Sequence, residues 1–201
     1  MVNLTATRVS ALAAVYREGT YGAADTAPGV VIAERRNLNL WILRGASSDH
    51  NFMAAAQSVF DVTLSIAPGT AASVGTASAL CLAPDEWLIS DGTAITGELT
   101  VSGGTCVDVS HGRTVLRVSG PRTRVLLAKG CGLDLHPSVF RSGHCAQTAI
   151  ARINVLMHLR DQDGAFDLYC SRSYALSFWR WVATSAAEFG YRVATPLMET
   201  P

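Results

Sequence analysis

The side chains that could support catalysis or bind a metal are scattered along the chain. Five histidines and five cysteines are spread over 201 residues, and His144-Cys145 is an adjacent pair. Adjacent side chains rarely point at each other, so this pair does not predict a thiol activated by a base. The cysteines contain no C-x-x-C pair, which argues against a zinc site and against a disulfide framework. We therefore expect free thiols in a reducing cytoplasm.

The acidic and glycine-rich segments also lack a catalytic or nucleotide-binding motif. The chain has no G-x-G-x-x-G, no G-x-x-x-x-G-K-[ST], no G-x-S-x-G and no H-E-x-x-H. The polar segment Asp108–Arg113 precedes a predicted strand, and we expect its Asp and Ser side chains to satisfy backbone amides in a turn, with a ligand loop as the alternative. Asp161 and Asp163 are expected in a turn, and Asp167 at a solvent-facing strand position. No nucleophile, base and oxyanion site comes together from these residues.

Charge excludes some classes of partner and suggests another. The 16 basic and 16 acidic residues cancel, which argues against nucleic-acid binding. No window is apolar enough to predict a membrane span. The charge is uneven, however: residues 1–112 carry 5 basic and 10 acidic residues, and residues 113–201 carry 11 and 6. The basic half predicts either a face that meets an acidic partner or an ordinary solvated face.

The chain divides into an arm and a repeated unit. Residues 1–38 have weak periodicity and many turn residues, so we expect an extended N-terminal arm that contacts a partner. Residues 39–201 are expected to form a single globular domain made of two halves, about 39–104 and 105–190. Each half reads as strand, helix, extended exit, strand and strand, with corresponding elements roughly 73–79 residues apart. This repeat predicts an α+β fold with two intertwined halves and mainly antiparallel sheet.

The individual elements follow from periodicity, caps and turn residues. The first half is predicted to contain strands Asn39–Gly45, Ala77–Leu82 and Glu86–Ser90, and a helix that is capped within Ser47-Ser48-Asp49 and runs through Phe60. The second half is predicted to contain strand Thr114–Gly120, a helix between Pro121 and Gly130, a hairpin of Gln147–Arg160 with Phe166–Cys170, and a last helix Ser173–Phe189.

The last predicted helix is apolar around most of its circumference, so it must be covered on more than one side. Either the helix lies inside the core of its own chain, or one face packs against another subunit through aromatic anchors. The candidate partner contacts are Tyr174, Phe178, Trp179 and Trp181.

Several segments carry a family resemblance. Residues 82–89 read L-A-P-D-E-W-L-I, and further matching segments are Val107–Pro121, Leu127–Pro137, Arg172–Ala175 and Trp179–Trp181. Together they resemble the gamma subunit family of heterotetrameric sarcosine oxidase, including its L-G-P-D-E-W-L signature, over residues 38–190. The D-V-S-H and V-S-G-P parts of Val107–Pro121 are more distantly similar to the aminomethyltransferase, or glycine-cleavage T-protein, fold.

This resemblance implies a T-protein-like fold and a non-catalytic structural subunit. Its partners would be the alpha, beta and delta subunits of a cytoplasmic complex that oxidatively demethylates sarcosine to glycine. The complex would yield hydrogen peroxide together with formaldehyde or 5,10-methylenetetrahydrofolate. The resemblance places FAD, covalent FMN, NAD, tetrahydrofolate and zinc on other subunits, and no catalytic, cofactor-binding or metal-binding residue on this chain.

Three alternatives remain open from the sequence. The first is the corresponding subunit of an N-methylglutamate dehydrogenase complex. The second is a stand-alone folate-binding aminomethyltransferase, although the hairpin Arg160-Asp161-Gln162-Asp163-Gly164 lacks the acidic G-G-x-x-D-D-like pattern of T-proteins. The third is a homo-oligomeric binding module unrelated to amine oxidation.

Overall fold

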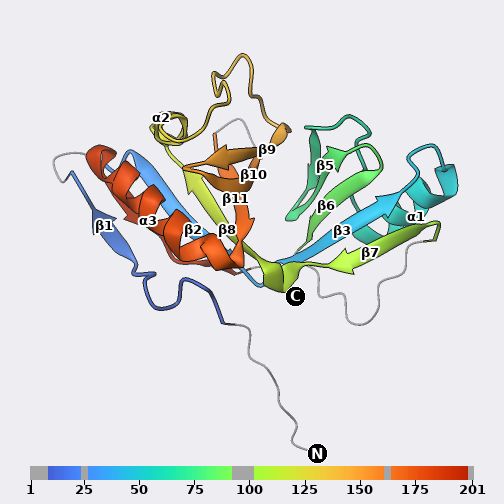
Figure 1. Ribbon diagram of the computed structural model, residues 1–201, viewed down its shortest axis with the longest axis horizontal. Helices are drawn as coiled ribbons and strands as arrows, with labels where there is room; N and C mark the ends of the chain where they lie inside the picture. Colours follow the sequence, from blue (N-terminus) through green and yellow to red (C-terminus); the bar gives the residue numbers. More distant parts are fainter. Residues whose placement is uncertain (1–8, 24–26, 92–101, 161–163, 199–201) are drawn as a thin grey trace, which may run out of the picture.

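Two β-sheets with helices on their outer faces make up the chain (Figure 1). The computed structural model describes residues 9–23, 27–91, 102–160 and 164–198. The eight-stranded sheet has the order β1 (Gly19–Tyr21), β12 (Tyr191–Val193), β2 (Val30–Arg36), β8 (Arg113–Ser119), β11 (Phe166–Ser171), β10 (Ile153–Leu159), β9 (Cys145–Ile150), with β13 (Leu197–Met198) paired to β2. The five-stranded sheet has the order β4 (Ala71–Val74), β5 (Ala77–Ala83), β6 (Glu86–Asp91), β3 (Asn39–Gly45), β7 (Gly104–Asp108).

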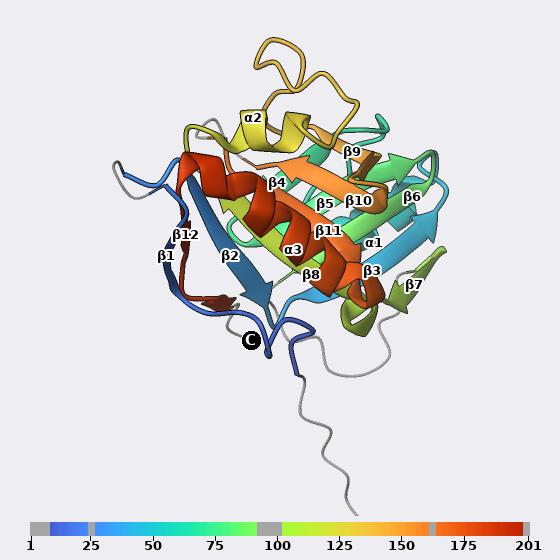
Figure 2. The same ribbon diagram turned by 60° about the vertical axis from the view of Figure 1, so that its left-hand side comes forward.

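Most strand pairs are antiparallel, as the sequence predicts. The exceptions among the described residues are β12 and β13, which both pair in parallel with β2. The helices are α1 (His50–Phe60), α2 (Thr123–Ala128) and α3 (Ala175–Ala186), with 3-10 turns η1 (Ser110–Gly112), η2 (Arg172–Tyr174) and η3 (Ala187–Phe189). Figure 2 shows α3 lying across the eight-stranded sheet, with α2 at one end of it. The result is an α+β fold.

Helix α1 covers the outer face of the five-stranded sheet. The carboxylate of Asp49 accepts hydrogen bonds from the backbone N–H groups of Asn51 and Phe52, and this cap fixes where the helix begins. The helix ends at Asp61, which adopts a left-handed conformation with φ 50°. Its buried residues, which include Phe52 and Phe60, belong to one core cluster with Leu43, Trp87 and other residues of the sheet.

The inner faces of the two sheets form a second apolar layer. Leu40, Leu80 and Leu88 come from the five-stranded sheet and meet Val115 and Tyr169 from the eight-stranded sheet. The outer face of the eight-stranded sheet forms a third cluster with α2, α3 and the segment before β1. Strand residues alternate between these layers, because successive side chains point to opposite faces of a sheet.

The two halves are intertwined by exchange of their first strands. Strand β2 precedes β3 along the chain but pairs with β8 in the other sheet. Strand β7 precedes β8 along the chain but pairs with β3. The two sheets therefore have matching orders, β2-β8-β11-β10-β9 and β7-β3-β6-β5-β4. The strand orders of the two sheets correspond to each other, and each half lacks a complete sheet without the other.

The exchange corrects the prediction that residues 1–38 form an arm. Val30–Arg36 is a strand inside the eight-stranded sheet, hydrogen-bonded on both sides. The first repeat therefore starts at β2, the counterpart of β7. Part of the remaining arm also lies on the core, since Leu12 and Tyr16 are buried. The β-branched run Val30-Val31-Ile32 was the signal for this strand, and the charged residues that follow it obscured the pattern.

The segment Gln147–Arg160, predicted as a single strand of a hairpin with Phe166–Cys170, is divided between two strands. Strands β9 and β10 are joined by a tight turn at Ala151 and Arg152, with φ values of 50° and 66°. This turn has no Gly, Asn or Asp to mark it, so the sequence gives no turn signal there. By contrast, Asn39–Gly45 is confirmed as predicted, and the last helix is confirmed as α3 with the flanking turns η2 and η3.

The exchanged strand β7 packs tightly against α1. Gly104 lies beside the ring of Phe52, and an added methyl group would overlap both that ring and the carbonyl oxygen of Arg44. We expect Gly104→Ala to lower the free energy of unfolding by about 1–3 kcal/mol, because the overlap forces the sheet away from the helix. Gly132→Ala is the matched control, since nothing lies within 4 Å of its added methyl group. Equal urea midpoints for the two variants would contradict this packing.

Candidate functional site

A cluster of charged side chains lies between the two sheets, centred on Asp167 of β11. The Asp167 side chain is fully buried and accepts a hydrogen bond from Arg35 Nη1 at 2.7 Å. Arg117 adds two hydrogen bonds of 2.8 Å, from Nε and Nη2 to the two carboxylate oxygens. Arg160 Nη1 lies 3.9 Å from the same carboxylate. These arginines come from three strands or their ends, so Asp167 joins β2, β8, β10 and β11.

Opposing effects set the protonation state of Asp167. Burial raises the pKa of this carboxyl group, but the hydrogen bonds from Arg117 and the charges of Arg35 and Arg117 outweigh burial. The pKa of Asp167 therefore lies below its ordinary value, and the group is ionised at neutral pH.

His158 and Tyr169 flank the cluster and are held neutral. The pKa of His158 is lowered from 6.5 to about 4, mainly by burial; the charge of Asp167 opposes this shift, and the neighbouring arginines add to it. Burial raises the pKa of Tyr169 to about 12. Neither ring nitrogen of His158 has a hydrogen-bond partner in the described part of the chain. Asp167, His158 and Tyr169 therefore keep their protonation states near pH 7. The cluster suits electrostatic cross-linking of the strands better than acid–base catalysis.

The position of Asp167 corrects the prediction that it faces solvent. Its strand alternates as F-D-L-Y-C, with Phe166, Leu168 and Cys170 on the outer face and Asp167 and Tyr169 on the inner face. The sequence pattern identifies the two faces but does not show that a second sheet covers the polar one. Asp161 and Asp163 lie outside the described residues.

A cavity of about 340 Å³ lies between the sheets, at the ends of β5, β8, β9 and β10. Its apolar lining comes from Leu82, Leu88, Val155 and Leu156, and its polar lining includes Arg113, Gln147 and Asn154. The lining carries one charged group, the Arg113 guanidinium. The cavity is therefore suited to a group with a negative charge and an apolar part.

The four candidate partner contacts occupy different environments. Tyr174 is 56% exposed. Phe178 and Trp179 are buried, and the Trp179 ring packs against Tyr16 with ring centroids 5.2 Å apart. Trp181 is half-buried and stacks on Phe178 with ring centroids 6.3 Å apart. Burial in the chain's own core removes Phe178 and Trp179 from the accessible surface, so the aromatic character of this helix reflects internal packing at those two positions.

The remaining sequence candidates have structural roles. The Asp108 carboxylate accepts a hydrogen bond from the Ser110 backbone N–H at 2.8 Å, and the Ser110 hydroxyl accepts one from the Leu40 backbone N–H at 2.8 Å. This is the turn predicted for Asp108–Arg113.

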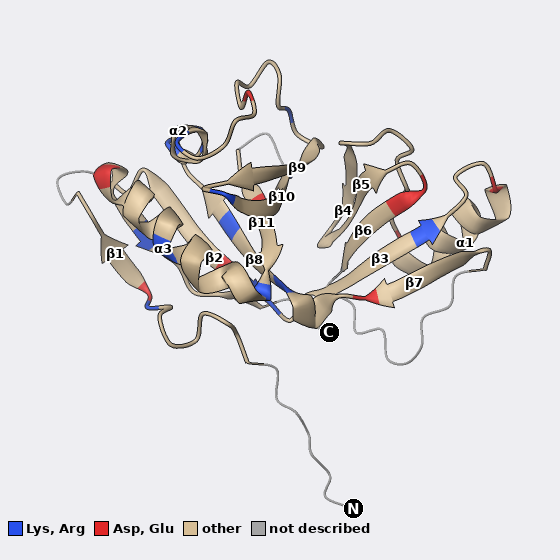
Figure 3. Ribbon diagram, in the orientation of Figure 1, with Lys and Arg blue, Asp and Glu red and all other residues tan. Residues whose placement is uncertain are grey.

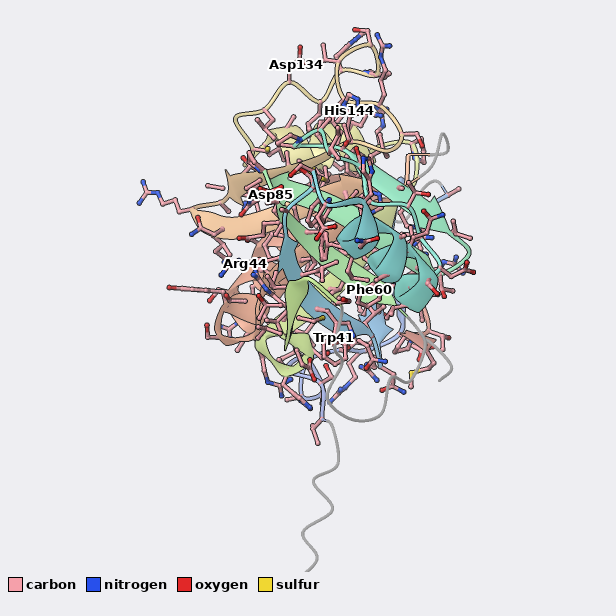
Figure 4. All side chains as sticks on the ribbon, turned by 90° about the vertical axis from the view of Figure 1, so that its right-hand side faces the viewer. Trp41, Arg44, Phe60, Asp85, Asp134 and His144 are labelled. Atoms are coloured by element: carbon pink, nitrogen blue, oxygen red, sulfur yellow. The ribbon has the colours of Figure 1, made fainter. Side chains whose placement is uncertain are left out.

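The adjacent pair His144-Cys145 does not form a nucleophile and base. The His144 ring packs edge-on against Phe140, and burial raises the pKa of the Cys145 thiol to about 12. Figure 4 shows His144 and Asp134 at the loop end of the molecule, away from Arg44 and Asp85.

Neither a metal-binding cluster nor a membrane-spanning helix occurs among the described residues. Within residues 9–23, 27–91, 102–160 and 164–198, no three His, Cys, Asp or Glu side chains gather in a way that could hold a metal ion. None of the helices in these ranges is both long and apolar enough to cross a membrane.

Comparison with known proteins identifies one family. Residues 44–188 match the model of the sarcosine oxidase, gamma subunit family. Curated relatives named sarcosine oxidase subunit gamma include a protein of Arthrobacter sp., 39% identical over 43% of this chain, and one of Corynebacterium sp. (strain U-96), 30% identical over 71% of this chain. The alignments span 45% and 71% of those two relatives.

Solved structures agree with the sequence matches. A chain of the heterotetrameric sarcosine oxidase from Corynebacterium sp. U-96, in complex with pyrrole 2-carboxylate, is similar with a TM-score of 0.79 and 26% identity. The similarity covers 90% of this chain and 96% of that chain. Aminomethyltransferase T of the glycine cleavage system from Bartonella henselae has a TM-score of 0.57 at 11% identity, covering 85% of this chain and 48% of that one. This second likeness shows that the fold is T-protein-like.

Removing the central charge tests the cross-linking role of the cluster. We expect Asp167→Asn to lower the free energy of unfolding by about 3–5 kcal/mol, because Arg35 and Arg117 lose the buried carboxylate that both of them bind. Asp61→Asn, at an exposed helix end, is the matched control. Chemical denaturation at pH 7 measures both. A loss for Asp167→Asn no larger than that for Asp61→Asn would contradict the role assigned to the cluster.

The depressed pKa of His158 predicts a pH dependence of stability. The unfolded chain takes up a proton at His158 as the pH falls below 6.5, whereas the folded chain does not until the pH nears 4. The free energy of unfolding therefore falls as the pH falls across this window, by about 1.5 kcal/mol between pH 6.5 and pH 5. We expect His158→Leu to remove this part of the slope and His111→Leu, at an exposed position, to retain it. Chemical denaturation at several pH values measures the slope of the free energy of unfolding against pH for both variants. Identical slopes would refute the assignment of this pH dependence to His158.

Proposed function

Since the chain belongs to the sarcosine oxidase gamma subunit family, we propose that it is the gamma subunit of a heterotetrameric, flavin-dependent sarcosine oxidase. The observation that carries this proposal is the similarity to a chain of a solved heterotetrameric sarcosine oxidase, which extends over nearly all of both chains. In the proposed complex, sarcosine is oxidatively demethylated to glycine. The one-carbon unit leaves as formaldehyde or 5,10-methylenetetrahydrofolate, and oxygen is reduced to hydrogen peroxide.

The proposed role of this chain is structural. In this proposal, FAD, covalent FMN, NAD, tetrahydrofolate and zinc are held by the alpha, beta and delta subunits. The fixed protonation states of Asp167, His158 and Tyr169 support a structural role, because none of these groups exchanges a proton near neutral pH. The proposal includes a cytoplasmic location, which is supported by five cysteines that are all unpaired thiols.

The proposed partner contacts are the accessible aromatic residues of the α3 region and the segment before β2. Tyr174 is exposed and Trp181 is half-buried beside Gly130. An exposed Tyr is a common interface anchor, because it offers apolar area and a hydroxyl group at a small entropic cost. The described part of the segment before β2 contacts the turns at both ends of α3, since Arg172 Nη2 donates to the Val9 carbonyl and the Ala23 backbone N–H donates to the Ala187 carbonyl, so the two features can form one continuous contact.

Capture of the tagged full chain from cells of its source organism tests the proposed function. We expect larger chains to co-purify, the eluate to show flavin absorbance, and hydrogen peroxide to form when sarcosine is added. The ratio of activities on sarcosine and N-methylglutamate identifies the substrate of the complex. A single colourless chain that binds a reduced folate would overturn the proposal.

The same capture tests the proposed contacts. We expect Tyr174→Ala to reduce recovery of the flavin-bearing chains severalfold, by loss of an aromatic anchor. Val59→Ala, on the exposed side of α1, is the matched control and should leave recovery unchanged. Equal recovery for both variants would exclude Tyr174 from the interface while leaving the family role intact.

A further inference from the structure

Arg113 is partly buried, yet its side chain makes no hydrogen bond or ion pair with a described residue. Among the described residues, five arginine side chains make no hydrogen bond or ion pair, namely Arg113, Arg122, Arg152, Arg180 and Arg192. Four of these are exposed, and water solvates their charges. Arg113 is the partly buried member of the group. A guanidinium that is partly removed from water and unpaired carries a desolvation cost, which an incoming anion would offset.

Arg113 stands where two hollows meet. On one side is the 340 Å³ cavity between the sheets, with its apolar lining of Leu82, Leu88 and Leu156. On the other side is a smaller hollow of about 50 Å³, lined by residues that include Arg36 and Arg172. Basic segments gather where β2 ends and β8 begins, at the junction of the two sheets (Figure 3).

The charges around Arg113 are strongly unbalanced. The lining of the small hollow includes four arginines, Arg35, Arg36, Arg113 and Arg172, and one carboxylate, Glu34. That carboxylate is already engaged, because it accepts hydrogen bonds from Arg36 Nε at 2.7 Å and from the Ser10 hydroxyl at 2.5 Å. Arg35 is paired with Asp167. Glu34 and Asp167 are therefore already bound by other groups, and the Arg113 guanidinium can pair with a further negative charge.

We propose that this groove, defined by Arg113 with the hollow on each side of it, binds an acidic segment of another subunit of the complex. A carboxylate of that segment pairs with Arg113, and an apolar neighbour enters the cavity beside Leu82 and Leu88. The inference rests on the proposed function, since it takes a subunit of the complex as the occupant. Hollows on both sides of the guanidinium favour an extended chain over a small ion, and the charge of the groove favours an acidic chain.

Charge reversal in the assembled complex tests this groove. Tagged full chains carrying Arg113→Gln, Arg113→Glu or, as the matched control, Arg192→Glu are captured from their source cells at physiological salt. We expect recovery of the flavin-bearing chains to fall about tenfold or more for both Arg113 variants, and further for Glu than for Gln. The control should recover the same amount as the unaltered chain. Since Arg113 has no ion pair to lose, the thermal midpoints of all isolated variants should agree within a few degrees.

The outcomes separate this inference from the function on which it rests. If the unaltered chain recovers flavin-bearing partners and both Arg113 variants recover as much, the groove is not the docking site. If the unaltered chain recovers no such partner, the proposed function fails and the inference fails with it. A third result is that succinate raises the thermal midpoint of the isolated chain in an Arg113-dependent manner while assembly is unaffected. That result would assign the groove to a small carboxylate and overturn the proposal.

Discussion

The structure depends on an ion pair that fastens an exchanged strand. Strand β2 comes from the first half of the repeat but completes the sheet of the second half, and Arg35 near its end binds Asp167 on β11 across the intervening strand β8. Arg117 of β8 binds the same carboxylate, so three neighbouring strands share one buried anion. A shift of β2 by one residue would turn Arg35 to the outer, apolar face of the sheet. The ion pair therefore selects the register that the strand exchange requires.

The buried ion pair that fixes the register lies beside two titratable groups, His158 and Tyr169, whose protonation states are also set by burial. Buried ion pairs add little net stability compared with apolar packing, but breaking one is costly. In the same interior, His158 is kept neutral and Tyr169 protonated by burial, next to an ionised Asp167. Groups that serve general acid–base catalysis need pKa values near the working pH, whereas the pKa of His158 is about 4, that of Tyr169 is about 12 and that of Asp167 is lowered. These pKa shifts fit the proposed structural role of a chain whose relatives are named as subunits of a larger enzyme.

The sequence was informative where local rules decide the structure. The strand Asn39–Gly45, a helix start within Ser47-Ser48-Asp49 and the last helix were predictable, because alternation, caps and 3.6-residue periodicity act within a few residues. Three features were not. Strand β2 is completed by partners more than 75 residues away along the chain, the turn at Ala151-Arg152 has no turn residue, and the burial of Asp167 depends on a second sheet. The burial of Phe178 and Trp179 was not predictable for the same reason, because periodicity places them on a helix face without showing what covers that face.

The arrangement of layers also limits where a partner can bind. Helices α1 and α3 cover the outer faces of the two sheets, and the inner faces meet in an apolar and ionic layer. Arg113 lines both hollows, one of which includes residues of both sheets. A partner that inserted a carboxylate there would contact strands from both halves of the repeat. Docking at this point would stabilise the strand exchange as well as the complex, because it would add a second charge contact beside the one that Asp167 supplies.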